Sequence, residues 1–190
     1  MKVMETKRQQ APGALEHVRA FVNTVDIEEG AEELGSGRTL GDWLSARGLA
    51  PPSLPVTEED LRHAIELREA IRSILLAHTL AVEPAEEATR VLDDAARRAD
   101  LRVRFGVVGD TSIEPGAAGV DAALGRLLAI VHETIGGGEW ERLKACREHT
   151  CAWAFYDHTK NHSGAWCNMR ACGNRAKARA YRERRAFFSE

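Results

Sequence analysis

Apolar residues recur three or four positions apart along most of the first 135 residues, which is the spacing of amphipathic helices. Thr39 and Thr57 are placed to act as N-caps, and Pro84 suits a first helical turn. The sequence LRVRFGVV alternates apolar and basic residues before the turn GDTSIEP, which predicts a β-hairpin. The body is therefore expected to be mainly α with one small β-hairpin. The predicted helices cover residues 14–33, 39–44, 58–80, 84–99 and 118–135.

The pattern changes at Gly136-Gly137-Gly138, which we interpret as a hinge or linker. It divides the chain into a mostly helical domain, 1–138, and a smaller module, 139–190. In the module, AWAFYD predicts a short strand. The alanine-rich AKARAYRERR predicts a helix over about 175–186, with Asn174 as its N-cap.

The charge balance changes sign at the same place. Residues 1–139 hold 15 Lys and Arg against 24 Asp and Glu, a net of −9, whereas residues 140–190 hold 11 against 5, a net of +6. An acidic body with a basic tail is expected when only the tail meets a polyanion. The alternative is that the tail docks on the protein's own acidic body.

The sequence contains no segment that predicts a membrane span or a secretory signal, so we expect a cytoplasmic protein. In that compartment, clustered cysteines are metal ligands more often than disulfides. It also lacks a nucleophile elbow, a phosphate loop and an HExxH motif, so we do not expect an enzyme.

The cysteines form two C-x4-C pairs separated by fifteen residues, a spacing typical of a structural zinc site. Four thiolates leave no open coordination position, and metal binding would supply folding free energy to a small module. Four buried free thiols and a disulfide pair are the alternatives, and His149, His158 and His162 lie near enough to replace a cysteine. The candidate ligands of one structural Zn2+ are Cys146, Cys151, Cys167 and Cys172.

The basic helix that follows the last cysteine is a candidate DNA-binding element. Charge surrounds much of this helix, which favours phosphate contact over burial, although a solvated terminal helix would look the same. The structural alternative for Arg175 is a hydrogen bond to carbonyls or to a carboxylate within the module, with Asp157 as a candidate partner. The candidate DNA contacts are Arg175, Lys177, Arg179, Arg182, Arg184 and Arg185.

In the body, Asn23 and Arg68 are candidates for a ligand pocket between helices, Arg68 for an anionic group. A core-bonded Asn23 and a surface Arg68 are the alternatives. Regulators often dimerise, so a homodimer is a further candidate, although the sequence has no heptad zipper.

The C-G-N-R sequence at 172–175, with WCNMRA before it and AKARAYRERR after it, resembles the CGNR zinc-finger proteins of bacteria. The segments FVNTVD (21–26), LGDWL (40–44) and DLRHAIELREAI (60–71) resemble that family's N-terminal ABATE domain. The resemblance implies a stress-induced transcriptional regulator whose zinc module, held by the four cysteines, binds DNA. Two further hypotheses are a zinc-stabilised protein-interaction module and a zinc-thiolate redox switch.

Overall fold

The computed structural model describes residues 9–107 and 109–187, and within them the protein is mainly helical with three small antiparallel hairpins. The body helices are α1 (Leu15–Val22), α2 (Gly37–Ala46), α3 (Glu58–Leu80), α4 (Glu86–Arg98) and α5 (Gly119–Gly136). The hairpins pair β1 (Val25–Asp26) with β2 (Ala31–Glu32), β3 (Leu101–Phe105) with β4 (Thr111–Pro115), and β5 (Leu143–Ala145) with β6 (Ala154–Tyr156). The remaining elements are η2 (Trp140–Arg142), η3 (Met169–Gly173) and α6 (Asn174–Phe187).

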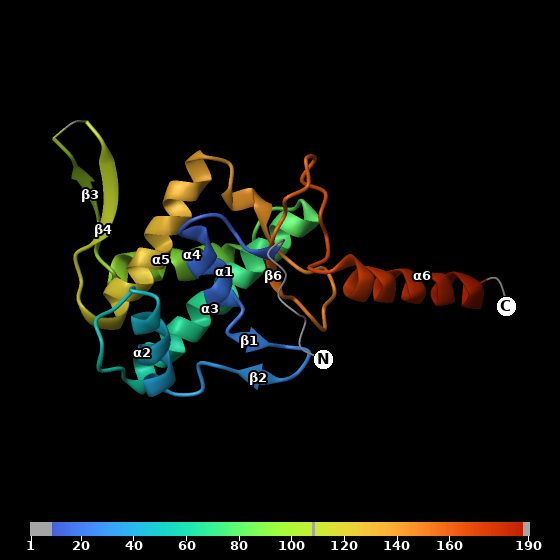
Figure 1. Ribbon diagram of the computed structural model, residues 1–190, viewed down its shortest axis with the longest axis horizontal. Helices are drawn as coiled ribbons and strands as arrows, with labels where there is room; N and C mark the ends of the chain where they lie inside the picture. Colours follow the sequence, from blue (N-terminus) through green and yellow to red (C-terminus); the bar gives the residue numbers. More distant parts are fainter. Residues whose placement is uncertain (1–8, 108, 188–190) are drawn as a thin grey trace.

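The long helix α3 lies in the middle of the body and packs against α1, α2, α4, α5 and β5 (Figure 1). Its start follows the sequence signal: Thr57 accepts a hydrogen bond from the backbone N–H of Asp60, and Asp60 accepts one from that of Thr57. This reciprocal arrangement is a capping box, and it confirms the predicted start. No described helix has the length and apolar character needed to cross a membrane.

The first helix is shorter than its apolar spacing predicts, so the expectation of a helix over 14–33 was wrong. The helix α1 ends at Val22, and residues up to 32 form the β1–β2 hairpin. Asp26 accepts hydrogen bonds from the backbone N–H groups of Glu28 and Glu29, which closes the turn, and Gly30 has a φ of 68°. Side chains of this kind compete with the helix for backbone groups.

Two helix starts differ slightly from the sequence prediction. Ser36, not Thr39, is the N-cap of α2, and Thr39 completes the capping box from the third position. Pro84 precedes Ala85, the N-cap of α4, and so lies just outside the first turn.

The β3–β4 hairpin was predicted correctly and projects from the body (Figure 1). Its base packs on α5, where a Cβ at Gly125 would come within 3.2 Å of the side chains of Leu101 and Pro115. Toward its tip the side chains face solvent, with Phe105 83% exposed.

The triple glycine does not separate two independent cores. It ends α5 at Gly136, as predicted, but Trp140, only four residues later, already belongs to the core of the body. The β5–β6 hairpin packs into the body's core, and the Leu143 side chain is fully buried there. A hinge at this point would have to break a continuous apolar core.

Candidate metal centre and nucleic-acid interface

The sulfur atoms of Cys146, Cys151, Cys167 and Cys172 all lie within 4.8 Å of one another, and all four residues are buried. The Sγ atoms of Cys151 and Cys167 are 3.6 Å apart, and those of Cys167 and Cys172 are 3.8 Å apart. A tetrahedral zinc site with Zn–S bonds of about 2.3 Å requires sulfur separations near 3.8 Å. The four thiols are unpaired by disulfides, so the donor set and its geometry fit one structural Zn2+.

A tight turn after β5 brings the first pair of cysteines together. The Cys151 and Ala152 N–H groups donate to the Glu148 carbonyl, at 2.8 and 2.9 Å. Ala152 has a φ of 47°, a left-handed conformation that lets the chain reverse direction beside the metal. The Cys146 N–H then donates to the Trp153 carbonyl, which starts the pairing of β5 with β6.

The second pair lies where a loop enters the C-terminal helix. Asn168 accepts hydrogen bonds from the N–H groups of Arg170 and Ala171, so it caps η3, in which Cys172 lies. Asn174 was expected to be the N-cap, and that expectation was wrong. Asn174 has helical backbone angles and donates to the Arg170 carbonyl, because the helical path begins five residues earlier.

Aromatic side chains enclose the cysteines. Phe155 is buried in the same cluster, and Trp153 and Trp166 pack against it. The nearby histidines have other contacts: His149 Nδ1 lies 3.3 Å from Glu148, and His158 Nε2 lies 3.1 Å from the Gln10 carbonyl. The metal site therefore comprises the four cysteines, with no described histidine among them.

A buried ion pair stabilises the turn between the two cysteine pairs. Lys144 Nζ donates to Asp157 Oδ2 at 2.9 Å, and also to the carbonyls of His162 and Gly164. Burial opposes ionisation of Asp157, but hydrogen bonds from Lys144, Thr159 and Gly164 hold the pKa of this carboxyl at about 2. Asp157 was a candidate partner of Arg175, but it pairs with Lys144 instead.

Arg175 lies beside the metal site and links it to the body. Its guanidinium donates two hydrogen bonds to Glu28, at 2.5 and 2.9 Å, and one to the Cys172 Sγ at 3.2 Å. The hydrogen bond from Arg175 lowers the pKa of Glu28. Arg175 therefore contacts a zinc ligand and the β1–β2 turn at the same time.

Arg179 also has a carboxylate partner. It donates to both oxygens of Glu148, at 2.8 and 3.3 Å, and the Glu148 side chain is only 1% exposed. This bond lowers the pKa of Glu148. Arg175 thus holds α6 against the β1–β2 turn and Arg179 holds it against the cysteine module. The sequence left a structural role open for Arg175 but favoured phosphate contact for Arg179.

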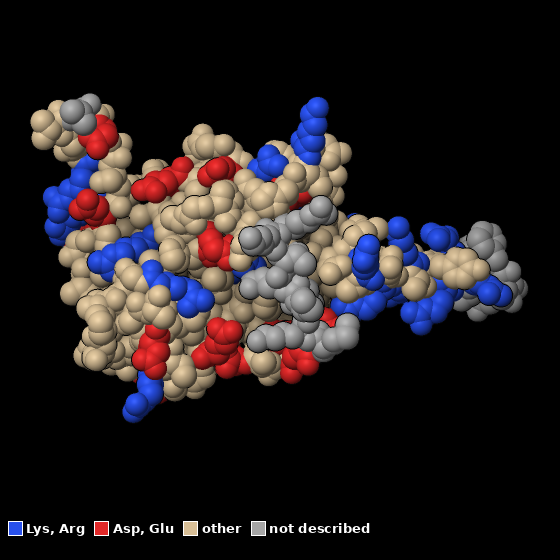
Figure 2. Space-filling model, viewed as in Figure 1, with Lys and Arg blue, Asp and Glu red and all other residues tan. Residues whose placement is uncertain are grey.

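The other predicted DNA contacts lie further along α6. Arg182 donates to the carbonyl of Ala178 at 3.3 Å, and the Arg185 guanidinium lies over the Tyr181 ring. Lys177 and Arg184 are exposed, and no described side chain pairs with either. At about 100° per residue, these two lie on the face of the helix opposite Arg175 and Arg179. Figure 2 shows Lys and Arg side chains along the projecting helix.

Asn23 and Arg68 do not line a common pocket: Asn23 lines a cavity with Thr24 and Trp153, and Arg68 is not among the residues of that lining. The Asn23 amide donates to the Ala154 carbonyl at 2.9 Å and accepts from the Ala154 N–H at 2.7 Å, so it pairs with β6 like a strand residue. Arg68 is buried and donates to Glu32, Glu69 and Thr24. An anionic ligand at Arg68 would have to displace Glu32.

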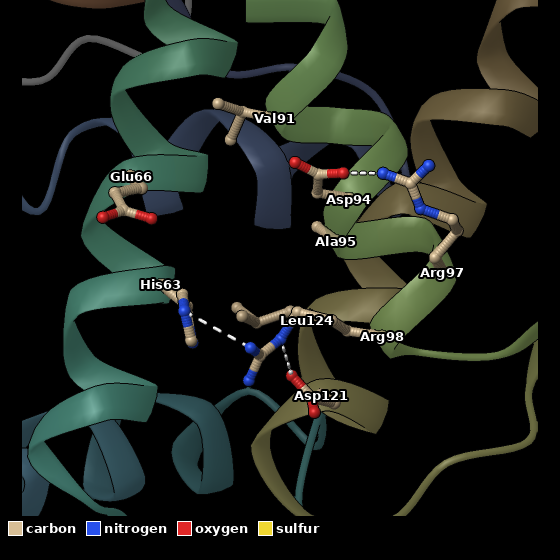
Figure 3. Close-up of a pocket in the computed structure, with 9 residues that line it drawn as sticks. All are labelled: His63, Glu66, Val91, Asp94, Ala95, Arg97, Arg98, Asp121 and Leu124. Atoms are coloured by element: carbon tan, nitrogen blue, oxygen red, sulfur yellow. Dashed lines mark hydrogen bonds and ion pairs between the residues drawn. The ribbon is translucent and has the colours of Figure 1, made fainter.

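A cavity of about 360 Å3 lies elsewhere in the body, between α3, α4 and the start of α5 (Figure 3). Arg98 crosses its lower end, with contacts to His63 at 3.3 Å and Asp121 at 3.1 Å. Asp94 pairs with Arg97 at the rim. Both arginines that line this cavity thus form ion pairs with aspartates of the same lining.

Two family matches cover most of the sequence. Residues 17–149 match the ABATE family, described as "Putative stress-induced transcription regulator". This match spans well over half of the chain. The protein belongs to this family.

Residues 142–185 match the CGNR zinc finger, and this segment contains all four cysteines of the metal site. The two matches overlap at the β5 strand, which belongs to the shared core. Among curated proteins there is no significant match to the chain.

The acidic partners of the basic helix could not be identified from the sequence. Glu28 and Glu148 look like ordinary surface acids in sequence, and Arg175 is 147 residues from Glu28. The net charge of each half indicated that basic and acidic segments could meet, but not which residues would. For Glu148, the sequence contains one local indication that it lies close to the metal site, because it stands inside the first C-x4-C pair.

Proposed function

We propose that this protein is a transcription regulator that binds DNA through the free face of α6, which its zinc site anchors. The observation that supports this most directly is the division of α6 into two faces. Arg175 and Arg179 are occupied by Glu28 and Glu148, whereas Lys177 and Arg184 carry exposed, unmatched charge within the described chain. Family membership and the four cysteines support a regulatory, zinc-binding role in general.

The proposal is tested by titrating a labelled duplex with zinc-loaded protein over a range of salt concentrations. The double variant Lys177→Ala/Arg184→Ala removes two charges that have no described structural partner. If both contact phosphates, affinity falls at low salt and the slope of log K against log salt decreases by about 1.8, or 0.9 for each lost contact.

The matched control is Arg90→Ala/Arg97→Ala on α4, which removes the same charge from exposed positions of the body. It should leave DNA affinity and its salt slope unchanged. Equal affinity of native protein and the α6 double variant at every salt concentration would contradict the proposal.

A second function, docking of the zinc module on the protein's own acidic body, is favoured by the Arg175–Glu28 contact. The two functions are compatible, because they use opposite faces of the helix.

A further inference from the structure

The Cys172 sulfur lies in a part of the metal site that is closed to solvent. Cys172 is fully buried, and it is one of four cysteines whose sulfurs surround a single metal position. As thiolates, the four sulfurs carry more negative charge than one Zn2+ neutralises, and burial of that excess charge is unfavourable without hydrogen bonds. A residue that donates to a metal-bound side chain typically changes metal affinity by about 10- to 100-fold.

Arg175 is such a donor. It follows Cys172 by three residues, at the junction of η3 and α6, so one helical turn places its guanidinium beside the sulfur. Its Nη2 atom lies 3.2 Å from the Cys172 Sγ and also donates to one oxygen of Glu28 at 2.9 Å. Nη1 donates to the other oxygen of Glu28 at 2.5 Å. Two parallel hydrogen bonds keep the guanidinium plane from turning, so Glu28 holds the donor against the sulfur.

Arg179 offers an internal comparison, because it forms the same kind of ion pair without the sulfur contact. It lies one turn further along α6 and donates to both oxygens of Glu148; within the described chain it makes no hydrogen bond to a cysteine sulfur. The side chains of the two arginines are similarly exposed, at 41% and 44%, but Glu148 is far more buried than Glu28. Loss of the Arg179 pair should therefore cost at least as much stability as loss of the Arg175 pair.

We propose that Arg175 is a positioning residue of the metal site, that it stabilises Cys172 as a thiolate ligand, and that Glu28 acts on the site through Arg175. The arginine of C-G-N-R thus acts at the metal, on the helix face opposite Lys177 and Arg184, and this role does not rest on the proposed DNA binding. The β1–β2 turn, which carries Glu28, becomes part of the support of the metal site.

The role of Arg175 is tested with the NMR signal of Cd2+, which replaces Zn2+ in the full-length protein and reports electron density at its sulfur ligands. Arg175→Gln should shift this signal, because the Cys172 sulfur loses a charged hydrogen-bond donor. The matched control Arg179→Gln should leave the signal in place, although it leaves a buried carboxylate unpaired. Arg175→Lys should restore the native position only in part, because an ammonium group lacks the planar fork that reaches Glu28 and the sulfur together.

Zinc affinity is measured alongside, by competition with a chelating dye. Arg175→Gln should bind zinc about tenfold more weakly, which is the lower end of the usual effect of such a donor. Glu28→Gln should weaken binding by about threefold, because Arg175 keeps its charge but loses its alignment. The double variant should bind zinc as Arg175→Gln does, since Glu28 acts through Arg175.

Circular dichroism of each loaded variant shows whether the native fold is kept. If Arg175→Gln does not fold, Glu28→Gln takes its place in the cadmium measurement, and its signal should move. An unmoved signal in the folded variant, or equal shifts in Arg175→Gln and Arg179→Gln, would overturn the role of Arg175. Additive losses of zinc affinity in the double variant would overturn the action of Glu28 through Arg175.

Discussion

Lys144 and Asp157 form an ion pair whose side chains are only 5% and 1% exposed. An ammonium group so deeply buried needs a counter-charge, because desolvation penalises an isolated ion heavily. Lys144 Nζ also donates hydrogen bonds to the carbonyls of His162 and Gly164. It therefore fixes the loop that brings the second pair of cysteines to the first.

We predict that Asp157→Asn destabilises the zinc-loaded protein by about 3 kcal/mol, because the variant leaves the Lys144 charge buried without a partner. Urea unfolding followed by circular dichroism measures the change. The exposed Asp93→Asn is the control and should change stability by less than about 0.5 kcal/mol. A loss similar to the control would show that the pair contributes nothing net.

The pH dependence of this difference follows from the lowered pKa of Asp157. A carboxyl whose folded pKa is depressed to about 2, from an ordinary 3.8, contributes stability that is present above 3.8 and lost as pH falls toward 2. The difference in free energy of unfolding between native protein and Asp157→Asn should therefore stay constant from pH 5 to pH 8. Unfolding measured at three pH values in this range checks it, and a steady decline toward pH 5 would contradict it.

At the scale of elements, the entry into α6 combines the metal site with a helix start. Cys172 lies in η3, one turn before the exposed part of α6, so the metal fixes where the basic helix begins. Asn168 closes this start by accepting two backbone hydrogen bonds. The direction of α6 therefore depends on a cap four residues before the last ligand.

Asn168→Ala should cost about 1 kcal/mol of stability, the usual value of a lost N-cap, and should weaken zinc binding. Asn174→Ala, at the residue that sequence analysis selected as the cap, should cost less, because Asn174 makes one exposed contact from within the helix. Urea unfolding and competition with a zinc-chelating dye measure both effects. Equal losses in the two variants would argue against Asn168 as the cap.

Elements with strong local signals could be predicted from sequence, and elements determined by distant partners could not. The N-cap at Thr57 and the alternation of β3 depend on neighbouring residues, and both were predicted correctly. The four cysteines were found by spacing alone. The end of α1 at Val22 was missed because the apolar spacing continues to Val25, whereas Asn23 pairs with Ala154, a contact 131 residues away, and Asp26 closes the turn that follows. The partners of Arg175 and Arg179 were missed for the same reason, since charge alone does not identify which acid lies opposite.

At the scale of the molecule, the metal module and the body are joined by hydrogen bonds from side chains of α3 to backbone carbonyls of the module. Arg72 donates to the Ala152 carbonyl, Thr79 to the Ala145 carbonyl, and His78 lies 2.9 Å from the Leu143 carbonyl. The β5–β6 hairpin belongs to the same apolar core as α3. The zinc site is therefore expected to support the whole fold.

Removal of zinc should lower the melting temperature of the entire protein in one cooperative transition, because loss of the metal frees a hairpin that completes the shared core. Differential scanning calorimetry with and without a chelator measures it. A body transition that keeps its temperature after chelation would show that residues 1–138 fold independently.

The pairing of Asn23 with Ala154 has a consequence for the order in which the chain can fold. A contact between α1 and β6 across 131 residues gives the N-terminal helix a partner that is synthesised near the end of translation. Contacts of such long sequence separation slow folding, because a large loop must close before they form. During synthesis, the apolar face of α1 therefore stays without its final cover until the zinc-binding segment has left the ribosome. The nascent body is a candidate chaperone client until then.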